Sequence, residues 1–435
     1  MELVASRAEP AARRRGMIRY SGGRGPGRRT AHSAIGDAAG ADNQAMTRGY
    51  QEKIVRRVQR KDLDMVSRNR QVILRLATLL TLALAAGPGS AGQPTGRADA
   101  ATATAWTTQH NPNTAGLRGI ACAPGGVCYA VGLTGTILMM SGAGSWTTRS
   151  SPTTKQLSSV ACPSATVCYA VGGMGTIVAT KAAASGAWGA RTSHTTALLT
   201  SMACPSVTVC YAVGTDNPLS ATMATILTTS DGGTTWTPRT FTAKSGGPAA
   251  LLSIACPSVK TCYAVGADNP LTPTKSFIVA TADGGKTWTQ RSMAMPPNLT
   301  GVSCPTQTTC YAVGSDKPTS PTKSYVVGGA AQAGVITTWK VLQTLTTPKL
   351  ALALTCPAVS ACVAVGSDSL VAPTKSYVAT GADLDKAGHW TAQEITPPGP
   401  KILFGVACTA KACYAVGNGI MSGPAPRQPA RSQKP

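Results

Sequence analysis

The residues of this chain whose type and spacing most clearly suggest a chemical role are its fourteen cysteines. They form seven close pairs, six with the spacing C-x5-C and the last with C-x4-C. Paired thiols either bind zinc or form disulfides, and a structural zinc site favours C-x2-C spacing or accompanying histidines. The pairs are Cys122/Cys128, Cys162/Cys168, Cys204/Cys210, Cys256/Cys262, Cys304/Cys310, Cys356/Cys362 and Cys408/Cys413.

Disulfides are favoured over zinc at these pairs. His110, His194 and His389 stand at no repeated position relative to the cysteines. Even, paired cysteines in an exported chain are typical of disulfides, and opposed residues on neighbouring strands have Cα atoms about 4.5–5.5 Å apart, near the disulfide range. We therefore expect one disulfide within each repeat, and no metal or cofactor.

Two repeated polar patterns are candidates for binding. Four repeats contain Gly-x-Asp, and in three of them the sequence continues to Pro-Thr-Lys-Ser and an aromatic residue. The alternating carboxylates and ammonium groups would form an arc on one face; the alternative is an Asp–Lys pair or Asx turn that only orders the loop. The residues are Asp216, Asp268, Asp316 and Asp368, then Lys275, Lys323 and Lys375, followed by Phe277, Tyr325 and Tyr377.

The second pattern is Trp-x-x-Arg, which occurs in four successive repeats. Arginines at one phase of an outermost strand would form a basic rim. Such a rim either docks an anionic partner or protects the exposed strand edge. The arginines are Arg149, Arg191, Arg239 and Arg291.

The elements that must position these residues are short strands in a sevenfold repeat. Seven tryptophans (Trp106, Trp146, Trp188, Trp236, Trp288, Trp339 and Trp390) each precede a cysteine pair. In one such unit, short runs of β-branched and small residues bounded by Gly, Pro and Ser predict strands at 157–162, 168–172 and 176–180 and a fourth from residue 188. Four-stranded units of this length indicate an all-β, seven-bladed β-propeller of antiparallel blades over residues 101–422. Because the last unit lacks a Trp strand, we expect the strand at Trp106 to complete it and close the ring.

The turns before two tryptophans give a family resemblance. Thr229-Ser-Asp-Gly-Gly-Thr-Thr-Trp236 and Thr281-Ala-Asp-Gly-Gly-Lys-Thr-Trp288 both fit [ST]-x-D-G-G-x-T-W. This resembles the Asp-box of BNR-repeat propellers, seen in sialidase-type and photosystem II assembly-factor-like proteins, over about residues 104–422. A structural role is expected: the Asp accepts backbone N–H bonds, the glycines permit positive φ, and the Trp packs on the hairpin. The residues concerned are Asp231, Gly233, Trp236, Asp283, Gly285 and Trp288.

Composition and charge place the repeat after an export signal. The 435 residues carry 40 Lys and Arg against 17 Asp and Glu, a net charge of +23. Residues 1–64 are rich in Arg, Gly and Ala, and we expect them to be disordered or to precede the true start. Residues 65–100 combine a basic segment, the apolar run 76–86 and Ala98-Asp-Ala100, which together predict a secretory signal peptide and linker. Residues 423–435 are a Pro-rich tail that we expect to be disordered.

These observations favour a secreted, non-catalytic scaffold. No serine-hydrolase, zinc-protease or phosphate-loop motif occurs, and Glu394 is the single glutamate past residue 65. We expect a monomer without a transmembrane span that binds a protein or an anionic polymer of the cell envelope, and not nucleic acid. The alternatives are a carbohydrate-binding or sialidase-type glycoside-hydrolase-like propeller, which would need an arginine trio and an activated Tyr, and a structural protein of the cell envelope.

Overall fold

The chain forms a propeller of short antiparallel strands. The structure, a computed structural model, describes residues 105–426 apart from 143, 181–186, 218–220, 242–248, 270–271, 294–295, 333–334, 383–389 and 397. Within the described residues lie 28 strands and two short 3-10 turns. The expectations for residues 1–64 and 65–100 fall outside this part, as do residues 427–435 of the tail.

The strands form seven four-stranded antiparallel sheets, which we call blades one to seven in chain order. Blade one holds β2 (Leu117–Cys122), β3 (Cys128–Gly132), β4 (Ile137–Met140) and β5 (Thr147–Arg149), with η1 (Leu133–Gly135). Blade two holds β6 (Leu157–Ala161), β7 (Tyr169–Gly172), β8 (Ile177–Thr180) and β9 (Trp188–Arg191), with η2 (Gly173–Gly175). Blade three holds β10 (Leu198–Ala203), β11 (Cys210–Thr215), β12 (Ala224–Thr229) and β13 (Thr237–Phe241).

The remaining blades repeat the same meander. Blade four holds β14 (Ala250–Ala255), β15 (Cys262–Ala267), β16 (Ser276–Thr281) and β17 (Thr289–Met293). Blade five holds β18 (Asn298–Ser303), β19 (Thr309–Ser315), β20 (Ser324–Gln332) and β21 (Val335–Leu345), and blade six holds β22 (Leu350–Ala358), β23 (Ala361–Ser367), β24 (Ser376–Ala382) and β25 (Trp390–Ile395). Blade seven holds β26 (Leu403–Cys408), β27 (Ala412–Gly417), β28 (Ile420–Pro424) and the N-terminal β1 (Thr107–Gln109).

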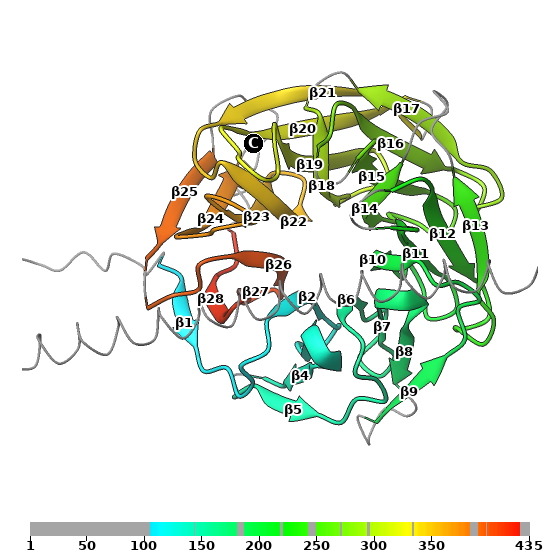
Figure 1. The fold of residues 1–435 in the computed structure, drawn as a ribbon, viewed down its shortest axis with the longest axis horizontal. Coiled ribbons are helices and arrows are strands. Elements are labelled where there is room, and N and C mark those ends of the chain that lie inside the picture. Colours follow the sequence, from blue (N-terminus) through cyan, green and yellow to red (C-terminus); the bar gives the residue numbers. More distant parts are fainter. Residues whose placement is uncertain are drawn as a thin grey trace, which may run out of the picture. The chain divides into compact units, whose positions relative to one another are not determined.

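The blades close into a ring through the N-terminal strand, as the sequence predicts. Each innermost strand contacts the innermost strand of the next blade, and β26 contacts β2 (Figure 1). In blade seven, β1 pairs with β28, with Thr107 opposite Ser422 and Gln109 opposite Ile420. Trp106 is buried beside this strand. The end of the last strand is corrected: β28 continues to Pro424, so its final two residues belong to the sheet and not to the tail.

Small residues at the centre of each blade let neighbouring blades approach closely. The second strand of blade one, β3, is buried along its whole length because it is covered on both faces. The middle position of this strand is an alanine in every blade, and each of these alanines is almost fully buried: Ala130, Ala170, Ala212, Ala264, Ala312, Ala364 and Ala415. The core is therefore a series of thin layers between blades, not one central cluster.

All seven cysteine pairs form disulfides within their own blades, as expected. Each bridge joins the end of the first strand to the start of the second, and the described residues include no free cysteine. In blade one, Cys122 lies directly opposite Cys128 in the sheet, with a Cα–Cα distance of 3.9 Å. The bridges therefore fasten the innermost hairpin of every blade.

The second cysteine of each pair is a core residue and not part of an accessible site. All seven are at most 1% exposed: Cys128, Cys168, Cys210, Cys262, Cys310, Cys362 and Cys413. They pack in the layers between blades, where Cys168 lies in one cluster with Tyr129 of blade one and Trp188 of its own blade. The same holds for Cys310 beside Tyr263, Cys362 beside Tyr311 and Cys413 beside Trp106. The cysteines are therefore a structural part of the hydrophobic core, in agreement with the expectation of one disulfide in each repeat.

Candidate functional site

The four loop aspartates (Asp216, Asp268, Asp316 and Asp368) order the loops between the second and third strands of blades three to six. In blade three, Asp216 Oδ1 accepts the backbone N–H groups of Asn217 at 2.9 Å, Thr222 at 2.9 Å and Met223 at 3.1 Å. The Thr222 hydroxyl donates to Oδ2 of the same carboxylate. The other three aspartates accept the equivalent hydrogen bonds six and seven residues further on: Thr274 and Lys275, Thr322 and Lys323, and Thr374 and Lys375.

These hydrogen bonds stabilise the ionised carboxylates. Partial burial alone would raise the pKa of Asp216, but the bonds from Thr222, Met223 and Asn217 outweigh it and lower the pKa to about 2. The pKa values of the other three loop aspartates are lowered by the same balance. Because N–H and hydroxyl groups of its own loop already bind each carboxylate, the geometry favours the loop-ordering alternative over direct partner contact for these four residues.

The aromatic residues of the same pattern face inward. Phe277, Tyr325 and Tyr377 are buried beneath the loops. Each lies opposite the glycine that precedes a loop aspartate by two positions; Tyr325, for example, pairs with Gly314. A Cβ atom on Gly314 would lie only 1.8 Å from the backbone oxygen of Asn298, so the glycine is required by the close approach of the first strand. The aromatics therefore contribute packing.

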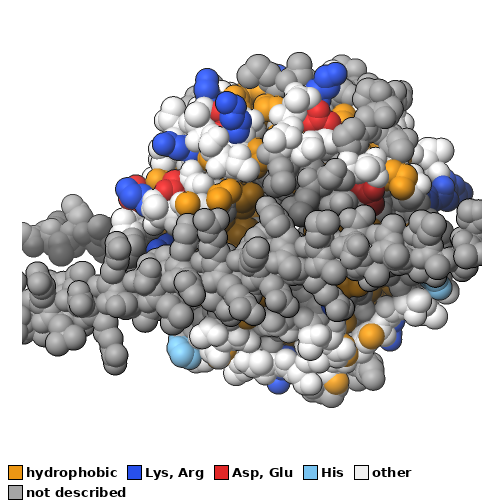
Figure 2. All heavy atoms as spheres, viewed as in Figure 1, with side chains coloured by type: hydrophobic (Ala, Val, Ile, Leu, Met, Phe, Trp, Pro, Cys, Tyr) orange, Lys and Arg blue, Asp and Glu red, His pale blue; other side chains and the backbone are white. Residues whose placement is uncertain are grey.

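The lysines of this pattern are what the loops present to solvent. Lys275, Lys323 and Lys375, which we call the lysine arc, are exposed and occupy one repeat position in blades four to six. Lys375 forms an ion pair with Glu394 at 2.6 Å, which raises the pKa of the lysine. The other two make no side-chain ion pair with any described residue. Figure 2 shows charged side chains gathered over the part of the ring where Figure 1 places β20, β21, β24 and β25.

The rim arginines share one register position but differ in their surroundings. Arg149, Arg191, Arg239 and Arg291 each pair with an isoleucine of the adjoining strand: Ile137, Ile177, Ile226 and Ile278. Arg149 is half-buried, and its Nη2 donates to Met139 Sδ at 3.3 Å. Arg239 is exposed, and its Nη1 donates to the backbone oxygen of Lys286 in the next blade at 3.5 Å. The structure therefore confirms the common phase, while contacts within the protein engage part of the rim.

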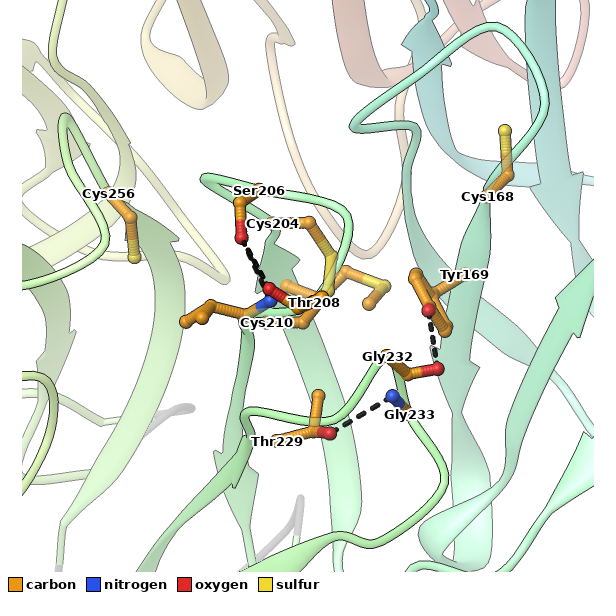
Figure 3. Close-up of a disulfide and its surroundings, with 12 residues drawn as sticks. Cys168, Tyr169, Cys204, Ser206, Thr208, Cys210, Thr229, Gly232, Gly233 and Cys256 are labelled. Atoms are coloured by element: carbon orange, nitrogen blue, oxygen red, sulfur yellow. Dashed lines mark hydrogen bonds between the residues drawn. A yellow bond between two sulfur atoms is a disulfide. The ribbon is translucent and has the colours of Figure 1, made fainter.

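The two [ST]-x-D-G-G-x-T-W turns connect neighbouring blades, and Figure 3 shows the turn of blade three. In blade three, the N–H of Gly233 donates to the Thr229 hydroxyl at 3.0 Å, and the N–H of Thr235 donates to Asp231 Oδ1 at 3.0 Å. The N–H of Gly232 donates to the backbone oxygen of Thr208 in the cysteine turn at 3.0 Å. Bonds from Thr235 and Thr229 lower the pKa of Asp231 to about 2.

A tyrosine from the preceding blade completes this connection. Tyr169 of blade two donates its hydroxyl to the backbone oxygen of Gly232 at 2.7 Å (Figure 3). Its ring lies edge-on to Trp236 of blade three, with 6.3 Å between centroids. The same Tyr–Trp contact joins other successive blades, so the tryptophan packs on the neighbouring blade as well as on its own hairpin: Tyr129/Trp188, Tyr211/Trp288, Tyr263/Trp339 and Tyr414/Trp146.

A cavity of ≈ 240 Å³ lies at the centre of the ring and is lined by the seven innermost strands. Each strand has a β-bulge at the same place, where one extra residue interrupts the pairing with the second strand. Bulges redirect side chains, and here the seven bulge residues all line the cavity: Arg118, Ser158, Thr200, Leu252, Thr300, Leu352 and Phe404. None of the described lining residues is an Asp or a Glu.

Arg118 is a polar group of this cavity that the sequence patterns above do not identify. Its guanidinium Cζ lies 4.0 Å from the centroid of the Phe404 ring. Its Nε is buried without a hydrogen-bond partner among the described residues. An alignment of the seven repeats on their cysteines would show the signal, since Arg118 occupies a position that otherwise holds only Ser, Thr, Leu or Phe.

Comparisons with known proteins support the fold alone. No protein-family model and no curated protein matches the sequence. Among solved structures, YCF48 from Cyanidioschyzon merolae is 12% identical with a TM-score of 0.52 and covers 74% of this chain and 98% of its own. YCF48 bound to a D1 peptide is 12% identical with a TM-score of 0.51 and covers 74% and 96%.

A glycoside hydrolase is also among the similar structures. The chain shares 13% identity and a TM-score of 0.52 with an ancestral GH74 enzyme, over 72% of this chain and 45% of that enzyme. The expected similarity to photosystem II assembly-factor-like propellers is therefore confirmed at the level of fold. At these identities the β-propeller fold is the only property that the comparisons transfer.

Proposed function

We propose that the chain is a non-catalytic scaffold that binds an acidic protein partner through the lysine arc. The observation that carries this proposal is the arrangement of Lys275, Lys323 and Lys375. Three adjacent blades repeat an exposed lysine, and a loop aspartate fixes each backbone by accepting its N–H at 3.2–3.3 Å. A row of cations on loops of fixed backbone steers an oppositely charged surface and sets its register.

Other features of the molecule support this assignment. The loops that carry the arc are the lengthened ones, and long loops on a rigid scaffold usually hold binding residues. Further exposed lysines follow on the same side of the ring, in the connections that lead into blades six and seven: Lys349 and Lys401. YCF48, which has a similar fold, is a peptide-binding propeller in one of its structures.

A non-catalytic role is proposed from the central cavity. Most glycosidases use a pair of carboxylates that flank the scissile bond. The described lining of the cavity consists of Arg118 and otherwise uncharged side chains. The tyrosine hydroxyls that a sialidase-type mechanism would need are engaged in the blade contacts, as at Tyr169 and Tyr211.

We also infer that the protein works outside the cytoplasm. Seven disulfides are typical of an oxidising compartment. The apolar segment 76–86 and Ala98-Asp-Ala100 supply a signal peptide whose removal would leave a mature chain beginning near Ala101. Among the described residues, no helix is long and apolar enough to cross a membrane.

The test compares two triple variants that remove equal charge. Lys275, Lys323 and Lys375 are replaced by Ala in one, and the exposed lysines of the opposite face, Lys260, Lys286 and Lys411, in the other. Partners captured from the envelope fraction by the tagged wild-type protein are identified, and their affinity for each variant is measured. The arc variant should bind at least tenfold more weakly and the control should bind normally, with both melting temperatures within a few degrees of wild type.

Three outcomes would contradict the proposal. Equal losses in both variants would indicate a non-specific charge effect. A loss confined to the control variant would place the partner on the cysteine-turn face. Capture of an anionic polymer with no protein component would favour the structural role in the cell envelope.

A further inference from the structure

The central cavity has the features of a small-ligand site that is separate from the lysine arc. At ≈ 240 Å³ it lies just below the range of about 300–1,000 Å³ that is usual for drug-sized ligands. It is formed by the innermost strands of all seven blades, which are fastened by disulfides (Figure 1). A site on such rigid elements is organised before its ligand arrives.

The charge in this cavity has no counter-charge. Arg118 is half-buried, and no Asp or Glu is among the described residues that line the cavity around it. Burial lowers the pKa of Arg118, as expected for a cation held away from water. A buried guanidinium N–H without an acceptor costs free energy, and an anion in the cavity would supply one.

The surroundings of Arg118 define what kind of anion would fit. The guanidinium Cζ lies over the Phe404 ring, 4.0 Å from its centroid. A guanidinium held over an aromatic face can still donate its in-plane N–H groups to an oxyanion. On the other side, Ser158 Oγ accepts a hydrogen bond from Gln156 Nε2 at 3.2 Å and keeps its own hydrogen to donate. These two residues are neighbours in the ring of bulge residues.

The rest of the ring offers an apolar surface. Leu252, Leu352 and Phe404 present hydrocarbon to the cavity. The two threonines of the ring direct their hydroxyls to backbone oxygens: Thr200 donates to Leu251 at 2.7 Å and Thr300 donates to Ala351 at 2.7 Å. Polar recognition is therefore concentrated at Arg118 and Ser158, and hydrocarbon lines much of the rest of the ring.

We propose that this cavity binds a small monocarboxylate that carries a compact apolar group. The carboxylate pairs with the Arg118 guanidinium in a bidentate manner and accepts a hydrogen bond from Ser158. The apolar group lies against Leu352 and Phe404. One cation in the cavity matches one negative charge, and the limited volume excludes larger ligands.

The test uses benzoate and its neutral analogue benzamide as probes, titrated calorimetrically into the oxidised full-length protein. Benzoate should bind the wild type with a Kd at least tenfold lower than that of benzamide. Arg118→Gln should remove this preference, and Arg118→Lys should keep part of it because the charge remains. The matched control is Arg239→Gln, which removes an exposed arginine on the rim and should leave the preference unchanged.

Two results would overturn the proposal. One is the absence of benzoate binding to the wild type at millimolar concentration. The other is undiminished benzoate binding to Arg118→Gln, which would place the probe elsewhere. Arg118→Lys conserves the positive charge and the aliphatic part of the side chain. It therefore provides a second test of the benzoate preference if Arg118→Gln fails to fold. The lysine arc is intact in every variant, so failure here leaves the proposed protein-binding function standing.

Discussion

Replacing Gly233 by alanine should destabilise the protein far more than the same change at its neighbour Gly232. Both glycines have positive φ, +76° and +71°, so both substitutions incur the cost of a left-handed backbone, about 1–2 kcal/mol. The two glycines differ in the space that is available for a Cβ atom. A Cβ on Gly233 would lie 2.6 Å from Cε1 of the Tyr169 ring, whereas a Cβ on Gly232 has no atom nearer than 3.7 Å.

The additional cost at Gly233 follows from how Tyr169 is held. If the ring stays, overpacking costs about 1–3 kcal/mol. If the ring moves, the protein loses the 2.7 Å hydrogen bond to Gly232, worth about 1 kcal/mol. It also loses the edge-on contact with Trp236, worth about 0.5–1.5 kcal/mol. Both routes give about 2 kcal/mol, so we expect a total near 3 kcal/mol for Gly233→Ala and near 1 kcal/mol for Gly232→Ala.

The assay is urea unfolding of the oxidised protein followed by tryptophan fluorescence. Tyr169→Val supplies the partner for a double-mutant cycle, because blade six already carries Val363 at the equivalent position. In the Tyr169→Val background, Gly233→Ala should cost no more than Gly232→Ala does. Equal costs for the two glycines in the wild type, or an unchanged cost of Gly233→Ala in the valine background, would refute the argument.

Three further expectations concern the whole ring. Deleting residues 105–112 removes β1 and the buried Trp106. The deletion should lower the free energy of unfolding by more than about 3 kcal/mol, as measured by urea unfolding. It should also promote association through the exposed edge of β28, as measured by light scattering. Full reduction should raise the intact mass by about 14 Da, two hydrogens for each bridge, and peptide mapping should find only links within blades. Stability should fall between about pH 4 and pH 2, because Asp216 and Asp231 have folded pKa values of about 2, below their unfolded value of about 3.9, and must take up protons on unfolding; a melting temperature constant over this range would contradict it.

Much of the fold could be predicted from the spacing of the cysteines and tryptophans, because each blade repeats the same local sequence pattern. The cysteine and tryptophan positions determine the number of blades, and the missing final Trp strand determines how the ring closes. Both follow from residues that recur in every unit. The contact between Tyr169 and Gly233 could not be predicted this way, because it joins residues of different blades and depends on how closely the layers pack.

The candidate sites illustrate the same limit. Gly-x-Asp followed by Thr and Lys indicates a loop with a carboxylate and an ammonium group, but not which of them faces solvent. The answer depends on the number of N–H groups that the loop can direct at Asp216, which is a property of the folded loop. The alternation of apolar and polar residues does not identify Arg118. A period of two predicts which face of the sheet each side chain occupies, whereas a bulge adds one residue that this period does not include.

The aspartates and the lysines of the loops have different roles, and this difference separates the stability of the molecule from its proposed binding. The described aspartates are held in their own turns, where hydrogen bonds order the loops and the connections between blades. Most lysines of the loops make no such bonds through their side chains and contribute little to stability. Under the proposed function, changes at Lys275 or Lys323 should therefore alter the partner's affinity while the ring, held together by disulfides and by Tyr–Trp contacts, stays intact. Arg118 combines the two roles, since its contact with the Phe404 ring packs two innermost strands together while its Nε has no hydrogen-bond partner among the described residues.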